Sequence, residues 1–211
     1  MRLRNKKNAN VIVNNSSYVI LNPKDNKGKW KEVFKNDNEI HIEIGMGKGQ
    51  FIIEMALRNP EINYIGIEKY DSVMLTAVNN LNSKEEKISN LRLIRMDATE
   101  IEEVFDKEIS RIYLNFSDPW PKAKHFKRRL TSEEFLTRYD NIFNNEKVIF
   151  QKTDNDELFE FSVESLINHG YTLKNVTRDL YSEMIPDNVA TEYELKFMEK
   201  GKNINRLEAY K

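Results

Sequence analysis

From about residue 40 to residue 168, short apolar runs alternate with longer amphipathic segments. The runs are rich in Ile, Leu, Tyr and Phe, a composition typical of β-strands. They lie at residues 40–44, 64–68, 91–96, 111–116 and 147–152. Between them, apolar residues recur every three or four positions, which predicts helices at residues 50–58, 71–82, 131–144 and 155–168. This alternation predicts an α/β fold, in which helices cover both faces of a mostly parallel sheet.

The C-terminal part of the chain gives weaker signals. The helix expected at 131–144 opens with Thr131 and Glu134, a capping-box pattern that marks a helix start. Two further strands are expected around a loop that contains Pro186 and Asp187, at residues 171–180 and 192–198.

The N-terminal residues 1–35 are polar and rich in Asn and Lys, with Trp30 and Phe34 near the end of the segment. This composition predicts a basic N-terminal arm, part of which is disordered. The remaining residues, 36–211, are expected to form a single domain, because 211 residues suffice for one α/β core but are few for two.

The composition indicates a soluble protein, with 32% charged residues and a mean hydropathy of −0.68. No stretch approaches the roughly 20 apolar residues of a membrane span, and the N-terminus lacks the apolar core of a secretory signal. The absence of cysteine excludes disulfides, thiolate metal sites and cysteine nucleophiles, and it fits a cytoplasmic location. The three histidines, His41, His125 and His169, lack the spacing of metal ligands, so no metal site is expected.

A glycine-rich turn follows the first strong strand. Gly45, Gly47 and Gly49 come directly after this strand and just before the helix expected at 50–58. Glycines permit a tight turn and let the backbone approach a ligand closely, and the start of a helix can receive polar ligand groups. The turn therefore predicts one wall of a ligand site.

Acidic residues occur at or near the ends of four successive predicted strands. They are Glu43, Glu68, Asp97 and Asp118. A single acid at such a position is commonly a helix cap, but four in succession beside a glycine turn indicate a shared ligand site. Ligands of open α/β sheets bind at the carboxyl ends of the strands, where these acids would meet.

The spacing of the glycines narrows the choice of ligand. The pattern G-x-G-x-G is neither the dinucleotide fingerprint G-x-G-x-x-G nor a phosphate-binding P-loop. A pyrophosphate would also fit poorly among several acids. S-adenosylmethionine fits better, because it offers ribose hydroxyls, an adenine amine and a cationic amino-acid tail to these carboxylates.

Residues 113–129 combine an acid, an aromatic residue and a cluster of cations. Asp118 and Trp120 lie beside two prolines, which leave the loop little freedom. The cations follow at Lys122, Lys124, Lys127, Arg128 and Arg129, with His125 among them. A net charge of −1 argues against a globally basic nucleic-acid binder but permits local patches such as this one. The loop indicates a site that acts on an aromatic base attached to a polyanion, although many charge runs are only solvated surface.

Taken together, the motifs resemble the bacterial tRNA (guanine-N7)-methyltransferases. The resemblance extends over nearly the whole chain from about residue 40. It rests on IEIGMGKGQF, YIGIEKY, MDA, NFSDPWPKAKHFKRRL, KTDN and ATEYELKF, in this order. It implies a Rossmann-like class I methyltransferase fold, S-adenosylmethionine as methyl donor and tRNA as partner, with the variable loop as target. The enzyme would be a monomer or homodimer that needs no membrane and no other protein.

The same resemblance implies roles for individual residues. Cofactor-binding residues would be Glu43, Gly45, Gly47, Gly49, Glu68, Asp97 and Asp118, with Asp118 also the catalytic acid. The substrate guanosine would contact Lys122, Asp154, Thr191, Glu192, Tyr193 and Glu194. The RNA would contact Lys124, His125, Lys127, Arg128 and Arg129.

Three other functions remain compatible with the residues themselves. A nicotinamide-dependent oxidoreductase shares the strand, glycine turn and acid, but it would normally need a substrate domain. A non-catalytic RNA-binding module could keep the fold and the basic patches. An enzyme that methylates an exocyclic amine of DNA or RNA also places an acid or amide with proline at this strand end. Binding of S-adenosylmethionine against NADH would separate the oxidoreductase, and methyl transfer to bulk tRNA would separate the binding module. Mapping the methylated base would decide between N7 and an exocyclic amine.

Overall fold

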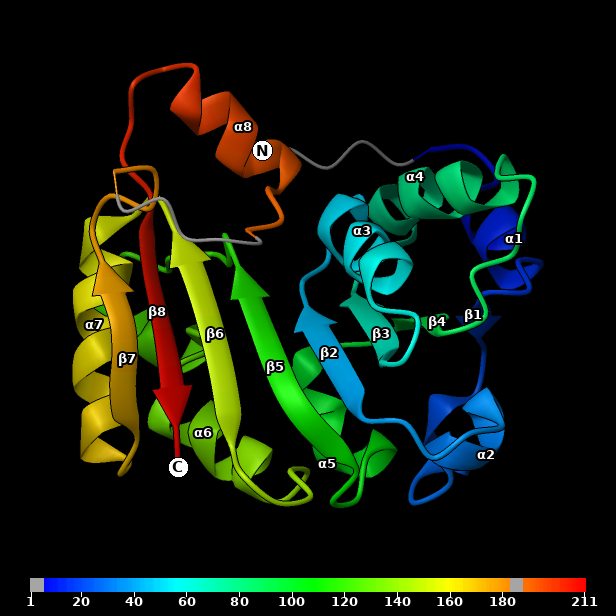
Figure 1. Cartoon of the computed structure of the whole chain (residues 1–211), viewed down its shortest axis with the longest axis horizontal. Helices are drawn as coiled ribbons and strands as arrows, with labels where there is room; N and C mark the ends of the chain where they lie inside the picture. The colour runs from blue at the N-terminus through cyan, green and yellow to red at the C-terminus, as the bar shows by residue number, and fades with distance from the viewer. Residues whose placement is uncertain (1–5, 183–187) are drawn as a thin grey trace.

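The structure is a computed structural model that describes residues 6–182 and 188–211. Within these residues, one sheet has the strand order β1-β4-β3-β2-β5-β6-β8-β7 (Figure 1). The strands are β1 (Val19–Ile20), β2 (Ile40–Ile44), β3 (Asn63–Glu68), β4 (Leu91–Arg95), β5 (Ile109–Asn115), β6 (Val148–Thr153), β7 (Thr172–Thr177) and β8 (Asn205–Tyr210). All neighbouring strands pair in parallel except that β8 is antiparallel to both β6 and β7.

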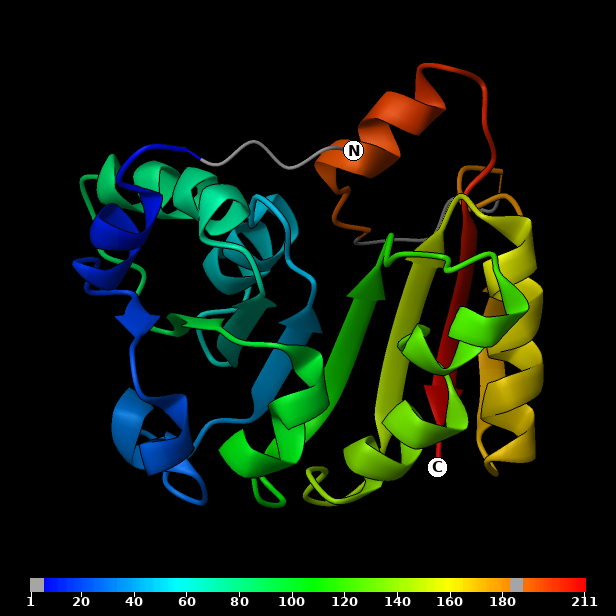
Figure 2. The same ribbon diagram turned by 180° about the vertical axis from the view of Figure 1, so that it is seen from behind.

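Helices cover the two faces of the sheet unequally. They are α1 (Ala9–Asn14), α2 (Trp30–Phe34), α3 (Gln50–Arg58), α4 (Asp71–Asn82), α5 (Ile101–Val104), α6 (Glu133–Asp140), α7 (Asp156–Asn168) and α8 (Glu192–Met198). On the face shown in Figure 1, α3 and α4 lie over β2, β3 and β4, while no described helix covers β5, β6, β8 and β7. Figure 2 shows α5, α6 and α7 on the opposite face. None of the described helices is long and apolar enough to cross a membrane.

The α/β fold and most of the expected elements are confirmed. The helices expected at 50–58 and 71–82 have the bounds of α3 and α4, and the first five expected strands match β2 to β6 within one or two residues at each end. The strand expected at 171–180 is confirmed in β7. The apolar period is reliable here because these elements are buried among isoleucine, leucine and aromatic side chains.

The prediction of a strand at 192–198 is wrong, because this segment forms α8. Thr191 and Glu194 make a complete capping box, in which each side chain bonds the other residue's backbone N–H. The strand that completes the sheet is β8, which the sequence analysis does not predict. Pro186 and Asp187, expected in the preceding loop, lie outside the described residues.

The prediction of a capping box at Thr131 and Glu134 is also wrong. The N-cap of α6 is Ser132, and its side chain makes no cap hydrogen bond. The hydroxyl of Thr131 instead bonds that of Ser162 on α7, 2.7 Å away, and both residues are buried. A buried partner on another helix therefore outweighs the local cap.

The segment expected to be an N-terminal arm is packed against the domain from Ala9 onward. In α1, Val13 is fully buried, and β1 pairs in parallel with β4 at the edge of the sheet. Trp30 is also fully buried, and its indole N–H donates to the carbonyl oxygen of Val104 at 2.9 Å. These residues help to close the core at one end of the sheet.

Candidate active site

The glycine turn leaves open space above its backbone. Gly45, Gly47 and Gly49 have φ of 79°, 58° and 78°, a left-handed conformation that favours glycine. A Cβ at Gly49 would lie 2.7 Å from the Cβ of Ala77, so this glycine lets α3 start against α4. At Gly45 and Gly47, a Cβ would meet no described atom within 4 Å. A ligand can therefore approach the backbone at these two positions.

Glu68, at the end of β3, ties the glycine turn to the start of α4. Its Oε2 accepts from the N–H of Gly47 at 3.2 Å, and its Oε1 accepts from the N–H groups of Lys69 and Tyr70 at 2.8 and 3.0 Å. Burial nevertheless raises the pKa of Glu68 above its ordinary value, and the negative charge of Asp118 acts in the same direction. Glu68 ends β3 and Asp118 follows β5, and both strands pair in parallel with β2, so the two acids lie at the same end of the sheet.

Asp97 follows β4 and caps the short 3-10 turn Ala98–Glu100. Its Oδ1 accepts from the N–H and the hydroxyl of Thr99 at 3.0 and 2.8 Å, and its Oδ2 pairs with Lys69 Nζ at 2.6 Å. Burial opposes ionisation, but the bonds from Lys69 and Thr99 outweigh it and lower the pKa of Asp97 to about 2. Asp97 is thus a charged helix cap beside the candidate site.

Glu43 lies in β2 beneath the glycine turn and is only 2% exposed. Its Oε1 accepts from the side-chain amide of Asn115 at 2.8 Å, whereas its Oε2 has no hydrogen-bond partner among the described residues. Burial raises the pKa of Glu43 to about 7, although Asn115 and the charge of Lys152 oppose the shift. A buried carboxylate with one free oxygen is a suitable acceptor for a donor group of a ligand.

The loop after β5 holds Asp118 between two strained residues. Phe116 and Trp120 have φ of 52° and 42°, which bulky residues rarely adopt and which occurs mostly at functional sites. Arg129 fixes the loop by donating from Nε to the carbonyl oxygen of Pro119 at 2.8 Å. Asp118 itself is exposed, and its carboxylate makes no hydrogen bond to any residue that the structure describes. The loop therefore presents a free carboxylate on a fixed backbone, unlike a structural turn acid.

The basic run after this loop is mostly exposed. Its first part, the 3-10 segment Ala123–Arg128, packs against Trp120: the guanidinium carbon of Arg128 lies 4.9 Å from the ring centroid, and His125 meets the ring edge-on. Lys127 forms an exposed ion pair with Glu134 at 2.8 Å. Exposed side chains that can receive RNA phosphates are those of Lys122, Lys124, Lys127 and Arg128.

Arg129 does not fit its expected contact with RNA. It is only 1% exposed, and its guanidinium lies between the rings of Phe126 and Phe161, with its carbon 3.9 and 4.6 Å from their centroids. Its Nη2 also pairs with Glu157 at 2.6 Å. Contact between Arg129 and RNA stays a prediction; in this structure, Arg129 holds the backbone of the Asp118 loop through Pro119.

Glu194 lies at the same end of the sheet but is fully buried. Its Oε2 accepts from Lys152 Nζ at 2.6 Å, and its Oε1 accepts from Asn188 Nδ2 and the Tyr181 hydroxyl at 2.6 and 2.8 Å. Lys152, on β6, is buried as well and also donates to the carbonyl oxygen of Val189 at 2.8 Å. With all these partners, Glu194 fastens α8 above β6 and leaves no carboxylate oxygen free for guanosine in this conformation.

The start of α8 contacts both sides of the site. Glu192 pairs with Lys48 of the glycine turn at 2.5 Å. The exposed ring of Tyr193 stacks on Phe116, with centroids 6.2 Å apart. Asp154, at the end of β6, pairs with Lys202 at 3.0 Å. The helix therefore bridges the glycine turn and the Asp118 loop.

Three of the four strand-end acids, Glu43, Glu68 and Asp118, thus gather around the open glycine turn. Sequence reasoning missed four residues that complete this arrangement: Lys48, Asn115, Lys152 and Asn188. For Asn115 and Lys152 a signal existed, because a polar residue inside an apolar strand run must find a buried partner. For Lys48 and Asn188 no local pattern marks the role.

A doubly wound sheet with a glycine turn after its central strand and an antiparallel β8 defines the class I S-adenosylmethionine-dependent methyltransferases. Among solved structures, an antibiotic-related methyltransferase matches with a TM-score of 0.63 and 18% identity, covering 89% of this chain and 93% of that chain. The 16S rRNA methyltransferase KamB matches with a TM-score of 0.64 and 12% identity, covering 87% and 91%. At these identities, the matches show the fold.

Sequence comparison identifies the family. A family model described as a putative methyltransferase matches residues 37–207. The tRNA (guanine-N(7)-)-methyltransferase of Lachnoclostridium phytofermentans is 51% identical over 100% of this chain and 99% of its own. That of Lysinibacillus sphaericus is 51% identical over 99% and 97%. The chain belongs to the tRNA (guanine-N(7)-)-methyltransferase family.

Proposed function

We propose that this protein transfers a methyl group from S-adenosylmethionine to N7 of a guanosine in tRNA, in the variable loop. The observation that carries this function is the free carboxylate of Asp118, which a strained loop holds at the same end of the sheet as Glu68 and directly before an exposed cationic run. Full-length identity of about half to relatives of this name supports it. A tRNA substrate implies a cytoplasmic reaction.

The residues around the glycine turn fit S-adenosylmethionine. The open space over Gly45 and Gly47 admits a ligand at the backbone, and the free oxygen of the Glu43 carboxylate suits a donor such as an ammonium group. Glu68 would bind the ribose hydroxyls and Asp97 the adenine side. When bound, the cofactor supplies an electrophilic methyl group on a sulfonium.

The chemistry of guanine assigns the remaining work to alignment and electrostatics. Guanine N7 has a lone pair outside the aromatic sextet, so its attack on the methyl carbon needs no strong base. As the bond from N7 to the methyl carbon forms, the methyl–sulfur bond would break and its electron pair would stay on sulfur, so the positive charge would pass from the sulfonium to the guanine ring. The carboxylate of Asp118 would stabilise this charge, and it would orient the base by accepting hydrogen bonds from the guanine N–H groups. Asp154, Lys122, Thr191, Glu192 and Tyr193 would complete the guanosine pocket, and Glu194 would hold α8 in place beside it.

The exposed cations bind the RNA backbone in this proposal. Lys122, Lys124, Lys127 and Arg128, with His125, would contact phosphates, which position an RNA without reading its sequence. An enzyme that reaches a base in folded RNA needs that base unstacked, so an exposed loop is the expected target. The exposed cations would be able to bind RNA in either a monomer or a homodimer.

Mass analysis of digested tRNA tests the proposal directly. Incubation of unmodified tRNA with the protein and S-adenosylmethionine should yield 7-methylguanosine as the new nucleoside. Methyl groups found on an exocyclic amine would favour the alternative methyltransferase instead. Tight tRNA binding with no new methylated nucleoside would indicate the non-catalytic RNA-binding module.

A further inference from the structure

A cavity of about 880 Å³ lies over β5, β6 and β8. On the face shown in Figure 1, no described helix covers these three strands. Side chains of α3 form one wall, and β5, β6 and β8 form the floor. Asn115, Lys152 and Arg206 are direct neighbours across these three strands and line the cavity near the active site. The N–H of Phe116 donates to the carbonyl oxygen of Lys152 at 2.8 Å, so the cavity adjoins the Asp118 loop.

The cationic side chains of this cavity outnumber the carboxylates paired with them. Three of these cations are each paired with one carboxylate, in the ion pairs Arg58–Glu54, Lys152–Glu194 and Arg206–Glu208. Arg111, on β5, has no carboxylate within ion-pair distance among the described residues. Its Nη1 contacts only the hydroxyl of Tyr113 at 3.4 Å, and its Nε is buried without a partner. A half-buried cation without an ion-pair partner costs stability, so Arg111 is available to an anionic ligand.

A second arginine with an unsatisfied donor lies close by. The guanidinium carbons of Arg111 and Arg206 are 4.5 and 5.7 Å from the centroid of the same ring, that of Phe150. Arg206 is 9% exposed, and its Nη1 has no hydrogen-bond partner among the described residues. Two guanidinium groups thus flank one aromatic ring at the floor of the cavity.

We propose that this cavity binds a phosphate group, held by Arg111 with Arg206 beside it. Guanidinium groups match the oxygens of phosphate and bind them with two parallel hydrogen bonds. The volume is also sufficient for a whole nucleotide. Because the cavity extends from the Asp118 loop along β5 to Arg111, the source we favour is a phosphate of the RNA strand that carries the target guanosine, and this choice rests on the proposed function. A free nucleotide would offer the same chemistry.

Titration with inorganic pyrophosphate tests the site without requiring methyl transfer. Calorimetry of the full chain should show that Arg111→Met weakens the binding of pyrophosphate at least tenfold. Without pyrophosphate, Arg111→Met should melt no lower than the parent protein, because it removes an uncompensated charge. Pyrophosphate should raise the melting temperature of the parent and not that of the variant.

Arg92 offers a matched control. Its guanidinium carbon also lies over a phenylalanine ring, 5.1 Å from the centroid of Phe34, but its donors are satisfied by the carbonyl oxygens of Ser89 and Leu91. Arg92→Met should lower the melting temperature and leave pyrophosphate affinity unchanged. Arg111→Lys keeps the charge without the planar fork, and it should bind pyrophosphate several-fold more weakly than the parent.

The outcomes separate the sources of phosphate. If RNA occupies the site, pyrophosphate competes with tRNA and Arg111→Met reduces the salt slope of tRNA binding by about one unit. If a free nucleotide occupies it, Arg111→Met loses pyrophosphate binding but keeps tRNA affinity. Unchanged pyrophosphate affinity in both Arg111 variants would overturn the proposal. Asp118→Asn should keep pyrophosphate binding even when methyl transfer is lost, so failure of the catalytic proposal is recognised separately.

Discussion

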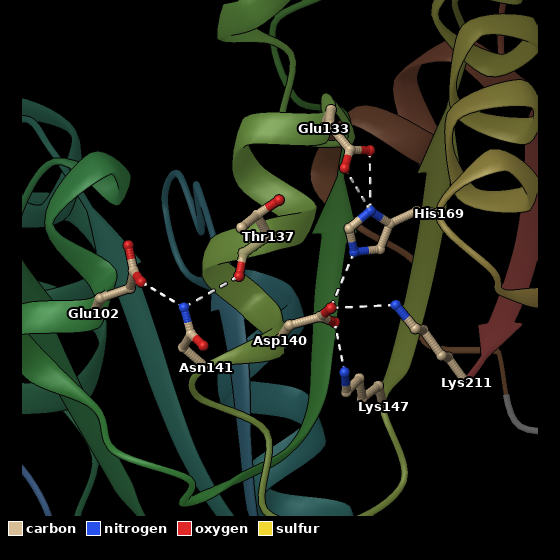
Figure 3. A network of polar contacts seen from close by, with 8 residues as sticks. All are labelled: Glu102, Glu133, Thr137, Asp140, Asn141, Lys147, His169 and Lys211. Atoms are coloured by element: carbon tan, nitrogen blue, oxygen red, sulfur yellow. Dashed lines mark hydrogen bonds and ion pairs between the residues drawn. The ribbon is translucent and has the colours of Figure 1, made fainter.

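The polar clusters at the two ends of the sheet differ in whether their carboxylates are paired with cations. At the end remote from the candidate active site, Asp140 on α6 has three positively charged or protonatable neighbours (Figure 3). Lys147 and Lys211 approach its carboxylate oxygens at 2.8 and 3.2 Å, and His169 Nε2 lies 3.1 Å away. The other ring nitrogen of His169 contacts Glu133 at 2.9 Å. This cluster joins α6, α7 and the ends of β6 and β8.

At the active-site end, the central carboxylates lack such compensation. Among the described residues, no ion pair links a cation to Glu43, Glu68 or Asp118. Burial raises the pKa values of Glu43 and Glu68, whereas ion pairs and hydrogen bonds outweigh burial and lower that of Asp140. The remote cluster therefore stabilises the fold, and the active-site cluster keeps acceptors available at some cost in stability.

The largest expected effect comes from Asp118. Asp118→Asn is nearly isosteric, but it removes the charge and replaces one acceptor with a donor that faces the guanine N–H groups. We expect turnover to fall by roughly a hundredfold or more, as for the loss of one preorganised electrostatic group. Single-turnover methyl transfer measures this effect, with melting temperature and tRNA affinity as controls. Near-normal turnover would refute the catalytic assignment.

Glu43 should make stability depend on pH. Its pKa in the folded protein is raised from 4.5 to about 7, so its ionisation is penalised only in the folded state. The penalty is absent below pH 4.5, grows as the pH rises to about 7, and reaches about 3 kcal/mol above that. Glu43→Gln removes the titration and can still accept from Asn115. In urea unfolding, the free energy of unfolding of the variant should therefore increase relative to that of the parent between pH 4.5 and about 7. A difference that does not change with pH would contradict the penalty on ionisation of Glu43.

Glu68→Ala tests the cofactor side of the comparison. The variant loses a carboxylate that would bind ribose hydroxyls and that also accepts from the N–H of Gly47. Loss of such a bond typically costs about 1.5–3 kcal/mol, so S-adenosylmethionine affinity should fall roughly tenfold or more. Calorimetry with S-adenosylmethionine measures this, and unchanged affinity would remove Glu68 from the site.

Arg128 and Arg129 show the same contrast between a side chain that is free to bind a ligand and one that stabilises the fold. Arg128 is exposed, whereas Arg129 is buried and paired with Glu157. Replacing Lys127 and Arg128 with Ala should flatten the salt slope of tRNA binding by up to about two units and leave the fold intact. Arg129→Ala should instead lower the melting temperature and turnover together. Equal effects of the two changes on the salt slope would mean that Arg129 reaches the RNA after all.

The regular part of this fold follows from the sequence because apolar periodicity determines β2, β3, α3 and α4 directly. The failures have a tertiary cause at Thr131 and a local cause at Glu194. Thr131 bonds a buried serine instead of capping its helix, and Glu194 lies in a capping box that the apolar pattern conceals. β8 alternates polar and apolar residues, since its polar side faces the uncovered half of the sheet, and this pattern is weak over six residues.

The candidate site shows the same limit. Its glycines and strand-end acids can be predicted, because their positions follow from the order of strands and turns. Whether a side chain is free or paired depends on segments far away in the sequence. Lys152 and Glu194 are 42 residues apart, and nothing local predicts that their pairing buries both. The same is true of Arg129, which belongs to a basic run by sequence and to the core by position.

The smallest effect is expected from Asp140, at the remote end. Asp140→Asn leaves Lys147, Lys211 and His169 without their shared carboxylate, in a cluster that is only partly exposed. Partly exposed ion pairs contribute little individually, so we expect a loss of about 1 kcal/mol and a fall of roughly 2–4 °C in melting temperature. Because the pKa of Asp140 is lowered from its ordinary 3.8, this stabilisation is present at neutral pH and disappears as the pH falls below that value. Turnover and S-adenosylmethionine affinity should stay at the parent level. A loss of activity without a loss of stability would show that the two ends of the sheet are coupled, and the division between a stabilising and a functional cluster would then be wrong.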